Sequence, residues 1–204
     1  MKKVSIIFVH YSDGIVKSYT GHGCLRRFWQ LAAKDSFLEI VVVNNGKKDQ
    51  HFKEICHKYF DNPSNNFAHA RNLGFDNSIG EYVCFVDNDI YPDRMFWYQC
   101  RELLEKYPDK KYIATSIWTS PHISKYSKGE IDGHVLNSRS GSNCLFMKRE
   151  TFLDIGRFDE TLPVHQVGVD FCDRQIQKGY LVIHTEPILA RDLGIRKFPY
   201  GHNL

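Results

Sequence analysis

The sequence predicts a single α/β domain whose mostly parallel central sheet has helices on both faces. Two strands are nearly continuous apolar runs, VSIIFVH at 4–10 and LEIVVVN at 38–44. Strands that are covered by helices on both faces have this appearance. The segments between the apolar runs have helical character, and a length of 204 residues suits one domain. We therefore expect one domain over residues 1–204.

The first half of the chain alternates strands with helices, as in a parallel sheet. Ligands of such sheets bind beyond the carboxyl ends of the strands, so the polar residues there are the first candidates for a site. Pro92 fits the first turn of a helix, where its missing N–H is tolerated. The expected elements are a strand over 4–10, a helix over 24–34, a strand over 38–44, helices over 50–59 and 67–78, a strand over 81–86 and a helix over 93–107.

The second half of the chain is less regular. Residues 119–140 form a polar stretch containing Pro121, Gly129 and Gly133, which predicts a long loop, and loops of that length are commonly functional. The other expected elements are strands over 112–118, 143–148 and 180–184, helices over 149–155 and 169–178, and a basic, aromatic tail over 191–204.

The composition is ordinary for a soluble domain, with 42% hydrophobic and 25% charged residues. A net charge of +3 is too small to predict a nucleic-acid partner. Six cysteines without a CxxC pair indicate reduced thiols in a cytoplasmic protein rather than a disulfide framework. The apolar run at 4–9 is too short for a signal peptide, and no run approaches the ~20 residues of a membrane span. We expect a cytoplasmic protein, and peripheral contact with a membrane stays open.

Two carboxylates, Asp87 and Asp89, directly follow the apolar run 83–86 at the end of a predicted strand. Such a pair can reach one hard cation, and Mg²⁺ or Mn²⁺ with oxygen ligands suits it. Mg²⁺ fills its remaining positions with water and substrate phosphates. The alternatives are a chance D-x-D and a helix cap formed by Asp89 or Asp93. An EF-hand fails, because its sixth residue would be Pro92 rather than glycine.

Four blocks of the sequence occur in a specific order and spacing. VSIIFVHYSDG and EIVVVNNGKKD come first, followed by NNFAHARNLGFDNSIGEYVCFVDND and GSNCLFMKRETFLDIGRFDETL. The third contains A-R-N-x-G before a D-x-D, and the fourth is similar to a strand followed by a G-G-F-D-E turn. Together they resemble the inverting, GT-A-fold nucleotide-sugar glycosyltransferases of family 2 over nearly the whole chain. The resemblance implies a Rossmann-like GT-A domain with a donor-binding half at 1–110 and an acceptor half with its tail at 111–204.

The same resemblance implies a metal site. Asp87 and Asp89 would hold the donor ribose and a divalent metal, Mn²⁺ or Mg²⁺, on the donor diphosphate. A third ligand often follows the last strand in this family. Asp192 lies near that position and is the first candidate, and His184 lies a few residues too early. Arg196-Lys197 in the tail would cover the diphosphate or lie in a solvated terminus.

Further donor contacts follow from the matched motifs. Arg71 and Asn72 would help to grip the nucleotide, with a solvated helix face as the alternative for Arg71. Asn45 stands where the family reads the base, or is a turn residue before a glycine. His10 and Tyr11 would flank or stack on the base, or pack at the end of their strand.

The catalytic base is where the sequence departs from the family. An inverting transferase needs a group that takes the proton from the acceptor hydroxyl. In HQVGVDFCDRQIQKGY the family's base falls on Gly168, which has no side chain. Asp170 is the first candidate and His165 the second, with Asp159 and Asp173 to be considered. Asp170 could instead cap the helix that follows it.

The leading hypothesis is a metal-dependent inverting glycosyltransferase that moves a sugar from a nucleotide-diphosphate donor, UDP-linked by expectation, to a glycan or polysaccharide hydroxyl. One alternative is a nucleotide- or glycan-binding domain that has lost its base. The other is a sugar nucleotidyltransferase, which HYSDG disfavours because it has one glycine and no basic cluster. The sugar, the acceptor and the choice among UDP, GDP and dTDP stay open, and the chain could be one domain of a longer protein.

Overall fold

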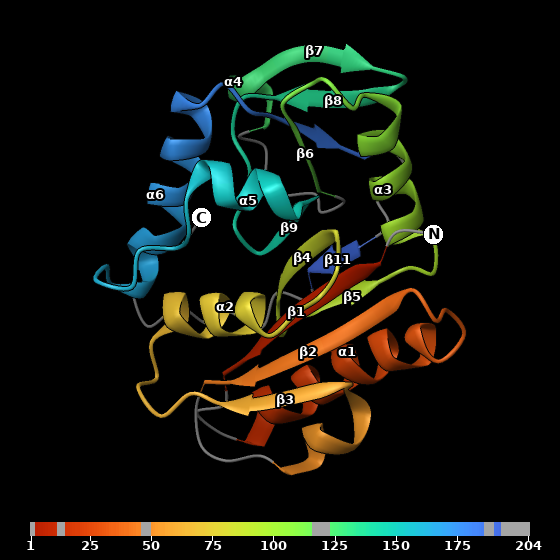
Figure 1. Ribbon diagram of the computed structural model, residues 1–204, viewed down its shortest axis with the longest axis vertical. Helices are drawn as coiled ribbons and strands as arrows, with labels where there is room; N and C mark the ends of the chain where they lie inside the picture. The colour runs from red at the N-terminus through yellow and green to blue at the C-terminus, as the bar shows by residue number, and fades with distance from the viewer. Residues whose placement is uncertain (1–2, 12–14, 46–49, 116–122, 186–189, 193–204) are drawn as a thin grey trace.

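A computed structural model describes residues 3–11, 15–45, 50–115, 123–185 and 190–192 of the chain (Figure 1). Within these ranges the elements are listed here in chain order. They are β1 (Val4–His10), α1 (Ile15–Ala32), β2 (Leu38–Asn44), the 3₁₀ helix η1 (Gln50–Ile55), β3 (Lys58–Asp61), α2 (Phe67–Asp76), β4 (Tyr82–Asp87), β5 (Ile90–Pro92), α3 (Phe96–Lys106), β6 (Tyr112–Thr115), α4 (Ile123–Tyr126), β7 (Ser127–Ile131), β8 (His134–Asn137), β9 (Cys144–Lys148), α5 (Arg149–Ile155), α6 (Val164–Gln177), β10 (Leu181–His184) and β11 (Ala190–Asp192).

One large sheet organises the described residues, in the order β3-β2-β1-β4-β9-β6-β10-β8-β7. It runs from β3 at the bottom of Figure 1 to the β7–β8 hairpin at the top. Its first four strands are parallel, as are β6 and β10. The pairs that involve β9, β8 and β7 are antiparallel. The α/β prediction is confirmed, and the sheet is more mixed than the sequence indicated.

Helices cover both faces of this sheet, because side chains along each strand point alternately to opposite sides. Ile6 and Phe8 of β1 pack on one side with Phe28 of α1 and Trp97 of α3. Ile7 packs on the other side in a cluster that includes Phe75 of α2, Phe152 of α5 and Phe171 of α6. The strands are therefore apolar throughout, as the sequence pattern predicted.

Several expected boundaries are wrong. The expected helix over 50–59 is a 3₁₀ turn followed by β3, and Pro92 lies in β5 rather than in the first turn of α3. The expected loop at 119–140 contains the β7–β8 hairpin in its described part. The last helix begins at Val164, five residues earlier than expected. Tertiary pairing decides short segments of this kind, which local propensity describes poorly.

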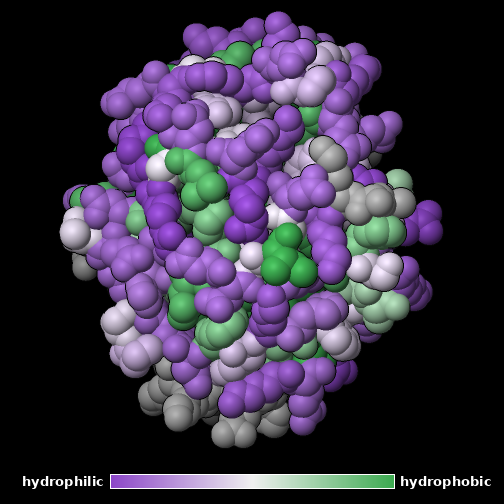
Figure 2. Space-filling view, viewed as in Figure 1, coloured by the Kyte–Doolittle hydropathy of each residue, from purple (hydrophilic) through white to green (hydrophobic). Residues whose placement is uncertain are grey.

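The cysteines, the helices and the surface also bear on the composition of the chain. All six cysteines are free thiols, five of them buried. None of the helices within the described ranges is long and apolar enough to cross a membrane. The view in Figure 2 is mainly hydrophilic, with hydrophobic side chains in small separate groups.

The contact between α2 and the sheet depends on Gly74. A Cβ at this position would lie 2.5 Å from Ile7 Cγ2 and 3.3 Å from Val43 Cγ2. We expect Gly74→Ala to lower the free energy of unfolding by about 1–3 kcal/mol, because the added methyl overpacks the core. Gly23→Ala in α1 is the matched control, since nothing lies within 4 Å of a Cβ there. Equal results for the two variants in urea unfolding would contradict this account.

A buried carboxylate joins β1, β2 and β3 near the amino ends of β1 and β2. Glu39 accepts hydrogen bonds from Ser5 Oγ at 2.5 Å and from the Ile79 amide at 2.9 Å, and it pairs with Lys58 Nζ at 2.8 Å. Burial raises the pKa of Glu39, but these partners together hold that pKa below its ordinary value of 4.5.

The stability that Glu39 provides should therefore depend on pH. A carboxyl group whose pKa is lower in the folded state stabilises the protein at pH values above its pKa in the unfolded state. That stability is lost as the pH falls through the pKa of the folded state. We expect Glu39→Gln to lower the free energy of unfolding at pH 7 and to flatten its decline between about pH 5 and pH 3. Urea unfolding over this range tests the prediction, and an unchanged slope would argue against it.

Candidate active site

The candidate site lies at the carboxyl edge of β1, β2 and β4. Strand register sets His10 beside Asn44, and Val9 beside Asp87. The polar residues that end these three strands are therefore neighbours, as expected for a parallel sheet. Asp87-Asn88-Asp89 continues from β4 into β5, so both carboxylates are fixed by strands on either side.

Asp87 is held by an arginine from α2. Its Oδ1 accepts a hydrogen bond from Arg71 Nη2 at 2.8 Å, and its main-chain N–H donates to Asn143 O at 3.0 Å. Arg71 Nη2 also donates to Ser142 O at 2.6 Å. The Asp87 side chain is 11% exposed and that of Arg71 is 0% exposed, so a buried ion pair sets the position of the carboxylate.

Arg71 is wholly buried, with an exposed fraction of 0%. Its guanidinium lies over the rings of Phe67 and Phe158, 4.2 and 4.9 Å from their centroids. The solvated helix face considered for this residue is therefore wrong. Its guanidinium donates to Asp87 and to Ser142 O, and a contact between Arg71 and a nucleotide stays a prediction.

Asp89 is also buried, with 6% of its surface exposed. Between the two aspartates, Asn88 Nδ2 donates to Tyr11 O at 3.0 Å and lies 3.4 Å from His10 Nδ1. Asn88 thus ties the turn to the end of β1, and this role was not foreseen from the sequence.

The metal ligands proposed from the sequence are brought together in part. β11 pairs with β5 so that Asp192 lies opposite Ile90, the residue after Asp89, although the Asp192 side chain is outside the described residues. His184 is buried at the end of β10, and β9 and β6 separate it from β4. No group of three His, Cys, Asp or Glu side chains forms a preassembled metal site among the described residues.

Two carboxylates still fit a divalent metal that is shared with a ligand. Mg²⁺ is usually bound through one or two protein carboxylates together with water and substrate phosphates. Asp87 and Asp89 supply hard oxygen donors of this kind at the edge of the sheet.

His10 and Tyr11 have different surroundings. The His10 ring is wholly buried and packs against Phe52, with the ring centroids 4.1 Å apart. A buried ring in this position supports the plain packing alternative rather than stacking on a base. Tyr11 is 40% exposed and is the one of the two that a ligand could reach.

Asn45 is buried and engaged by the loop before α2. Its Oδ1 accepts from Asn62 Nδ2 at 2.6 Å, and its Nδ2 donates to Asn65 O at 3.4 Å. Asn62 Nδ2 also donates to Asn66 O at 2.8 Å. These contacts give Asn45 a structural role in ordering the loop at the site's edge.

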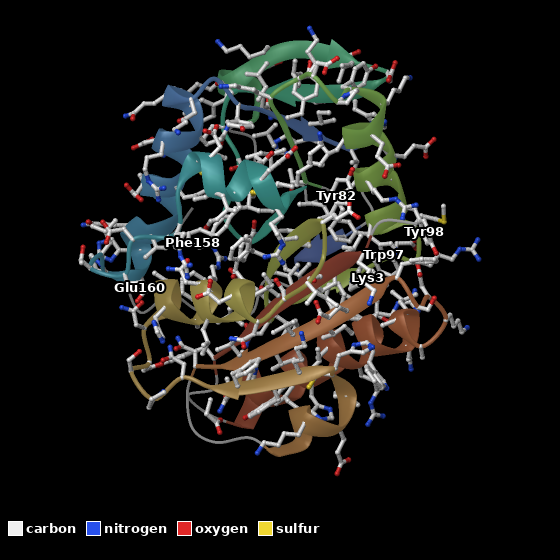
Figure 3. The ribbon with its side chains drawn as sticks, in the orientation of Figure 1. Lys3, Tyr82, Trp97, Tyr98, Phe158 and Glu160 are labelled. Atoms are coloured by element: carbon white, nitrogen blue, oxygen red, sulfur yellow. The ribbon has the colours of Figure 1, made fainter. Side chains whose placement is uncertain are left out.

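Asn72 holds the turn after α5 in place. Its Nδ2 donates to Phe158 O at 2.9 Å and to Glu160 Oε1 at 2.7 Å, and its Oδ1 accepts from the Phe158 amide at 3.2 Å. Figure 3 shows Phe158 and Glu160 beside the start of α2. The hydrogen bond from Asn72 lowers the pKa of Glu160, burial raises it, and His69 lowers it further, so that the pKa lies below its ordinary value. Neighbouring residues of α2 therefore hold two different structures: Arg71 holds Asp87, and Asn72 holds the turn after α5.

Comparison with known proteins agrees with this geometry. The sequence model of the family described as "Glycosyl transferase family 2" matches residues 15–160, well over half of the chain. The chain belongs to glycosyl transferase family 2. The matched range includes Arg71, Asp87 and Asp89, and it ends before α6.

Curated proteins that are named glycosyltransferases match short parts of the chain. An "Uncharacterized glycosyltransferase" from Rickettsia felis is 34% identical over 33% of this chain and 14% of its own length. "Glycosyltransferase GlyA" from Streptococcus pneumoniae is 40% identical over 26% of this chain and 9% of its own length. The matches thus span about a tenth of each relative.

Solved glycosyltransferase structures share the fold. A crystal structure of GalNAc-T7 with UDP, GalNAc and Mn²⁺ superposes with a TM-score of 0.69 at 14% identity, covering 94% of this chain and 43% of that one. S. aureus TarS gives a TM-score of 0.66 at 15% identity, covering 93% and 36%. The fold of the chain is therefore that of GT-A glycosyltransferases.

The four acidic and histidine side chains considered as the base have different surroundings. Asp170 lies in the second turn of α6, so it does not cap the helix, and its Oδ2 accepts from Arg174 Nη2 at 2.6 Å and Nε at 3.0 Å. Arg174 also donates to the carbonyls of Ile155 and Gly156. This ion pair gives Asp170 a structural role and disfavours it as the base.

The other candidates differ in exposure and engagement. Asp159 accepts from the Thr161 amide and hydroxyl, which hold the pKa of Asp159 below its ordinary value. Asp173 pairs with Arg139 at 3.4 Å. His165 is exposed in the first turn of α6, three residues before Gly168, and therefore shares its helix face.

Proposed function

We propose that the chain is the catalytic domain of a metal-dependent, inverting glycosyltransferase. The donor is a nucleotide-diphosphate sugar, UDP-linked by preference, and the acceptor is a hydroxyl of a glycan or polysaccharide. The observation that carries the proposal is the buried Asp87–Arg71 pair beside Asp89 at the carboxyl end of β4. That arrangement presents fixed oxygen donors at the edge where ligands of such sheets bind.

Mn²⁺ or Mg²⁺ would be held by Asp87 and Asp89, with Asp192 as the nearest further candidate, and it would supply positive charge to the leaving diphosphate. The protein's own part is to hold the donor side rigid. Arg71 fixes one oxygen of Asp87, and Asn88 fixes the turn between the aspartates. Tyr11, exposed beside this turn, is the residue best placed to contact the nucleotide.

In an inverting transfer the acceptor oxygen bonds to the anomeric carbon as the bond to the diphosphate breaks, and the hydroxyl proton passes to a base. We assign the base to His165, because it is exposed on the helix face that carries Gly168 while Asp170 is paired with Arg174. A ring nitrogen of an imidazole is a common general base.

The assignment of the base predicts a split between two variants. His165→Ala should reduce turnover by roughly 10²–10⁴-fold, because general-base catalysis contributes that much, and should leave UDP affinity unchanged. Asp170→Asn should lower thermal stability through Arg174 and leave turnover per folded molecule nearly intact. Steady-state release of UDP measures both, and a large loss only in Asp170→Asn would return the base to that residue.

A donor-binding domain without transferase activity is the second candidate, and Gly168 is the observation that favours it. Incubation with Mn²⁺ and a panel of UDP-, GDP- and dTDP-sugars separates the two. Release of nucleotide from one donor supports the enzyme, whereas tight UDP binding with no release from any donor supports the binding domain. Free cysteines throughout suit the cytoplasmic location that we propose.

A further inference from the structure

Gly168 in α6 lies against the loop that precedes β9, earlier in the same half of the chain. A Cβ added to it would lie 2.3 Å from Ser142 Oγ and 2.6 Å from Ser142 Cβ. A serine Cβ is bonded to the backbone, so rotating the side chain cannot relieve the second contact. Any side chain at 168 must therefore displace the main chain of the 138–143 loop or the helix itself.

That loop provides two main-chain carbonyls that hold Arg71 and Asp87. Ser142 O accepts from Arg71 Nη2 at 2.6 Å, and Asn143 O accepts from the Asp87 amide at 3.0 Å. The loop therefore supports Asp87 twice, through the arginine and directly. A shift of Ser142 by a fraction of an ångström acts on both contacts.

The same loop is fixed to α6 one turn further along. Ser140 O accepts from Cys172 Sγ at 3.1 Å, and Ser140 Oγ donates to Gln175 Oε1 at 3.4 Å. Gln175 is wholly buried. With α6 holding the loop at 140 and touching it at 142, the loop cannot shift freely to accommodate a larger residue at 168.

We propose that Gly168 and Ser142 are positioning residues for the aspartate at the end of β4. The missing side chain at 168 lets α6 approach Ser142 closely, and this approach holds the Ser142 carbonyl where Arg71 and Asp87 need it. The inference rests on the proposed function only in taking Asp87 as a donor-site residue. It also explains why a carboxylate cannot simply be restored at 168, since Gly168→Asp adds the same Cβ.

The test is a graded series of variants. Gly168→Ala should improve the helix by propensity alone, yet we expect it to weaken UDP binding in the presence of Mn²⁺ by about tenfold. Adding Ser142→Ala removes only Oγ and should recover part of the affinity. Adding Ser142→Gly removes both contacting atoms and should restore affinity to that of Ser142→Gly alone. Gly23→Ala, a helical glycine with open space around it, should bind as the wild type does.

A second readout needs neither metal nor nucleotide. Side-chain NMR of Arg71 reports its bonds to Asp87 and Ser142 O through the chemical shift and exchange rate of its Nη protons. We expect Gly168→Ala to speed this exchange and the Ser142→Gly/Gly168→Ala pair to restore it. An unchanged Arg71 signal in Gly168→Ala, or a loss that Ser142→Gly does not repair, overturns the inference. If the Arg71 signal follows the series but the wild type binds no UDP, the proposed function fails and the positioning role stands.

Discussion

Asp89→Ala is expected to abolish the metal-dependent part of UDP binding. Asp89 and Asp87 are the two carboxylates at the end of β4, and a Mg²⁺- or Mn²⁺-nucleotide site of this size has only one or two protein carboxylates. Losing Asp89 removes one of the two carboxylates proposed to bind the metal at the end of β4. Isothermal titration of UDP with and without Mn²⁺ measures the effect, and the variant should bind UDP equally weakly in both conditions.

The control for this variant is Asp109→Ala, which removes an exposed carboxylate from the loop before the amino end of β6. It should keep the full difference between titrations with and without Mn²⁺. Treating the wild type with a chelator should lower its affinity to that of Asp89→Ala. If Asp89→Ala retains wild-type affinity for UDP with Mn²⁺, the metal assignment is wrong.

Arg71→Ala is expected to lower the free energy of unfolding by about 3–5 kcal/mol, because it leaves the buried Asp87 charge without its partner. The matched control is Arg157→Ala. Arg157 and Asp76 form an equally short pair at 2.7 Å, but both side chains are nearly half exposed, and such pairs contribute about 0–1 kcal/mol.

Chemical unfolding of the two arginine variants separates a buried pair from an exposed one. Asp87→Asn added to Arg71→Ala should recover part of the loss, because no buried charge is then left uncompensated. Similar small losses for Arg71→Ala and Arg157→Ala would mean that Arg71 does not hold Asp87 as described.

Three expected elements match the structure to the residue, Val4–His10, Leu38–Asn44 and Arg149–Ile155. Apolar runs bounded by polar residues carry the local signal for the two strands. The first helix was predicted poorly, since it begins at Ile15, nine residues before the expected start at 24. The β7–β8 hairpin was missed although its signal was present. Asp132-Gly133 is an Asp-Gly pair with φ of 51° and 76°, the turn that favours a two-residue hairpin.

The sequence indicated where the residues of the candidate site lie, but it did not indicate which contacts each of them makes. The D-x-D position follows from an apolar run that ends in carboxylates. The burial of Arg71 does not, because an arginine on a helix is usually solvated and only its packing between Phe67 and Phe158 reverses that. Asn72 and Glu160 are joined across 88 residues, and no local pattern encodes such a contact.

The role of Gly168 was also beyond the sequence. A glycine at the family's base position indicates a lost group when only side-chain chemistry is considered. Its contact with Ser142 depends on how α6 meets a loop 26 residues earlier in the chain, and tertiary packing alone determines that distance.

A crystal structure of the protein with UDP and Mn²⁺ would show whether Asp87 and Asp89 hold the metal. We expect an anomalous manganese peak beside the Asp87 and Asp89 oxygens, with the UDP diphosphate on the same ion and Arg71 still paired with Asp87. UDP bound elsewhere, or a manganese peak away from the end of β4, would mean that these aspartates do not form the metal site.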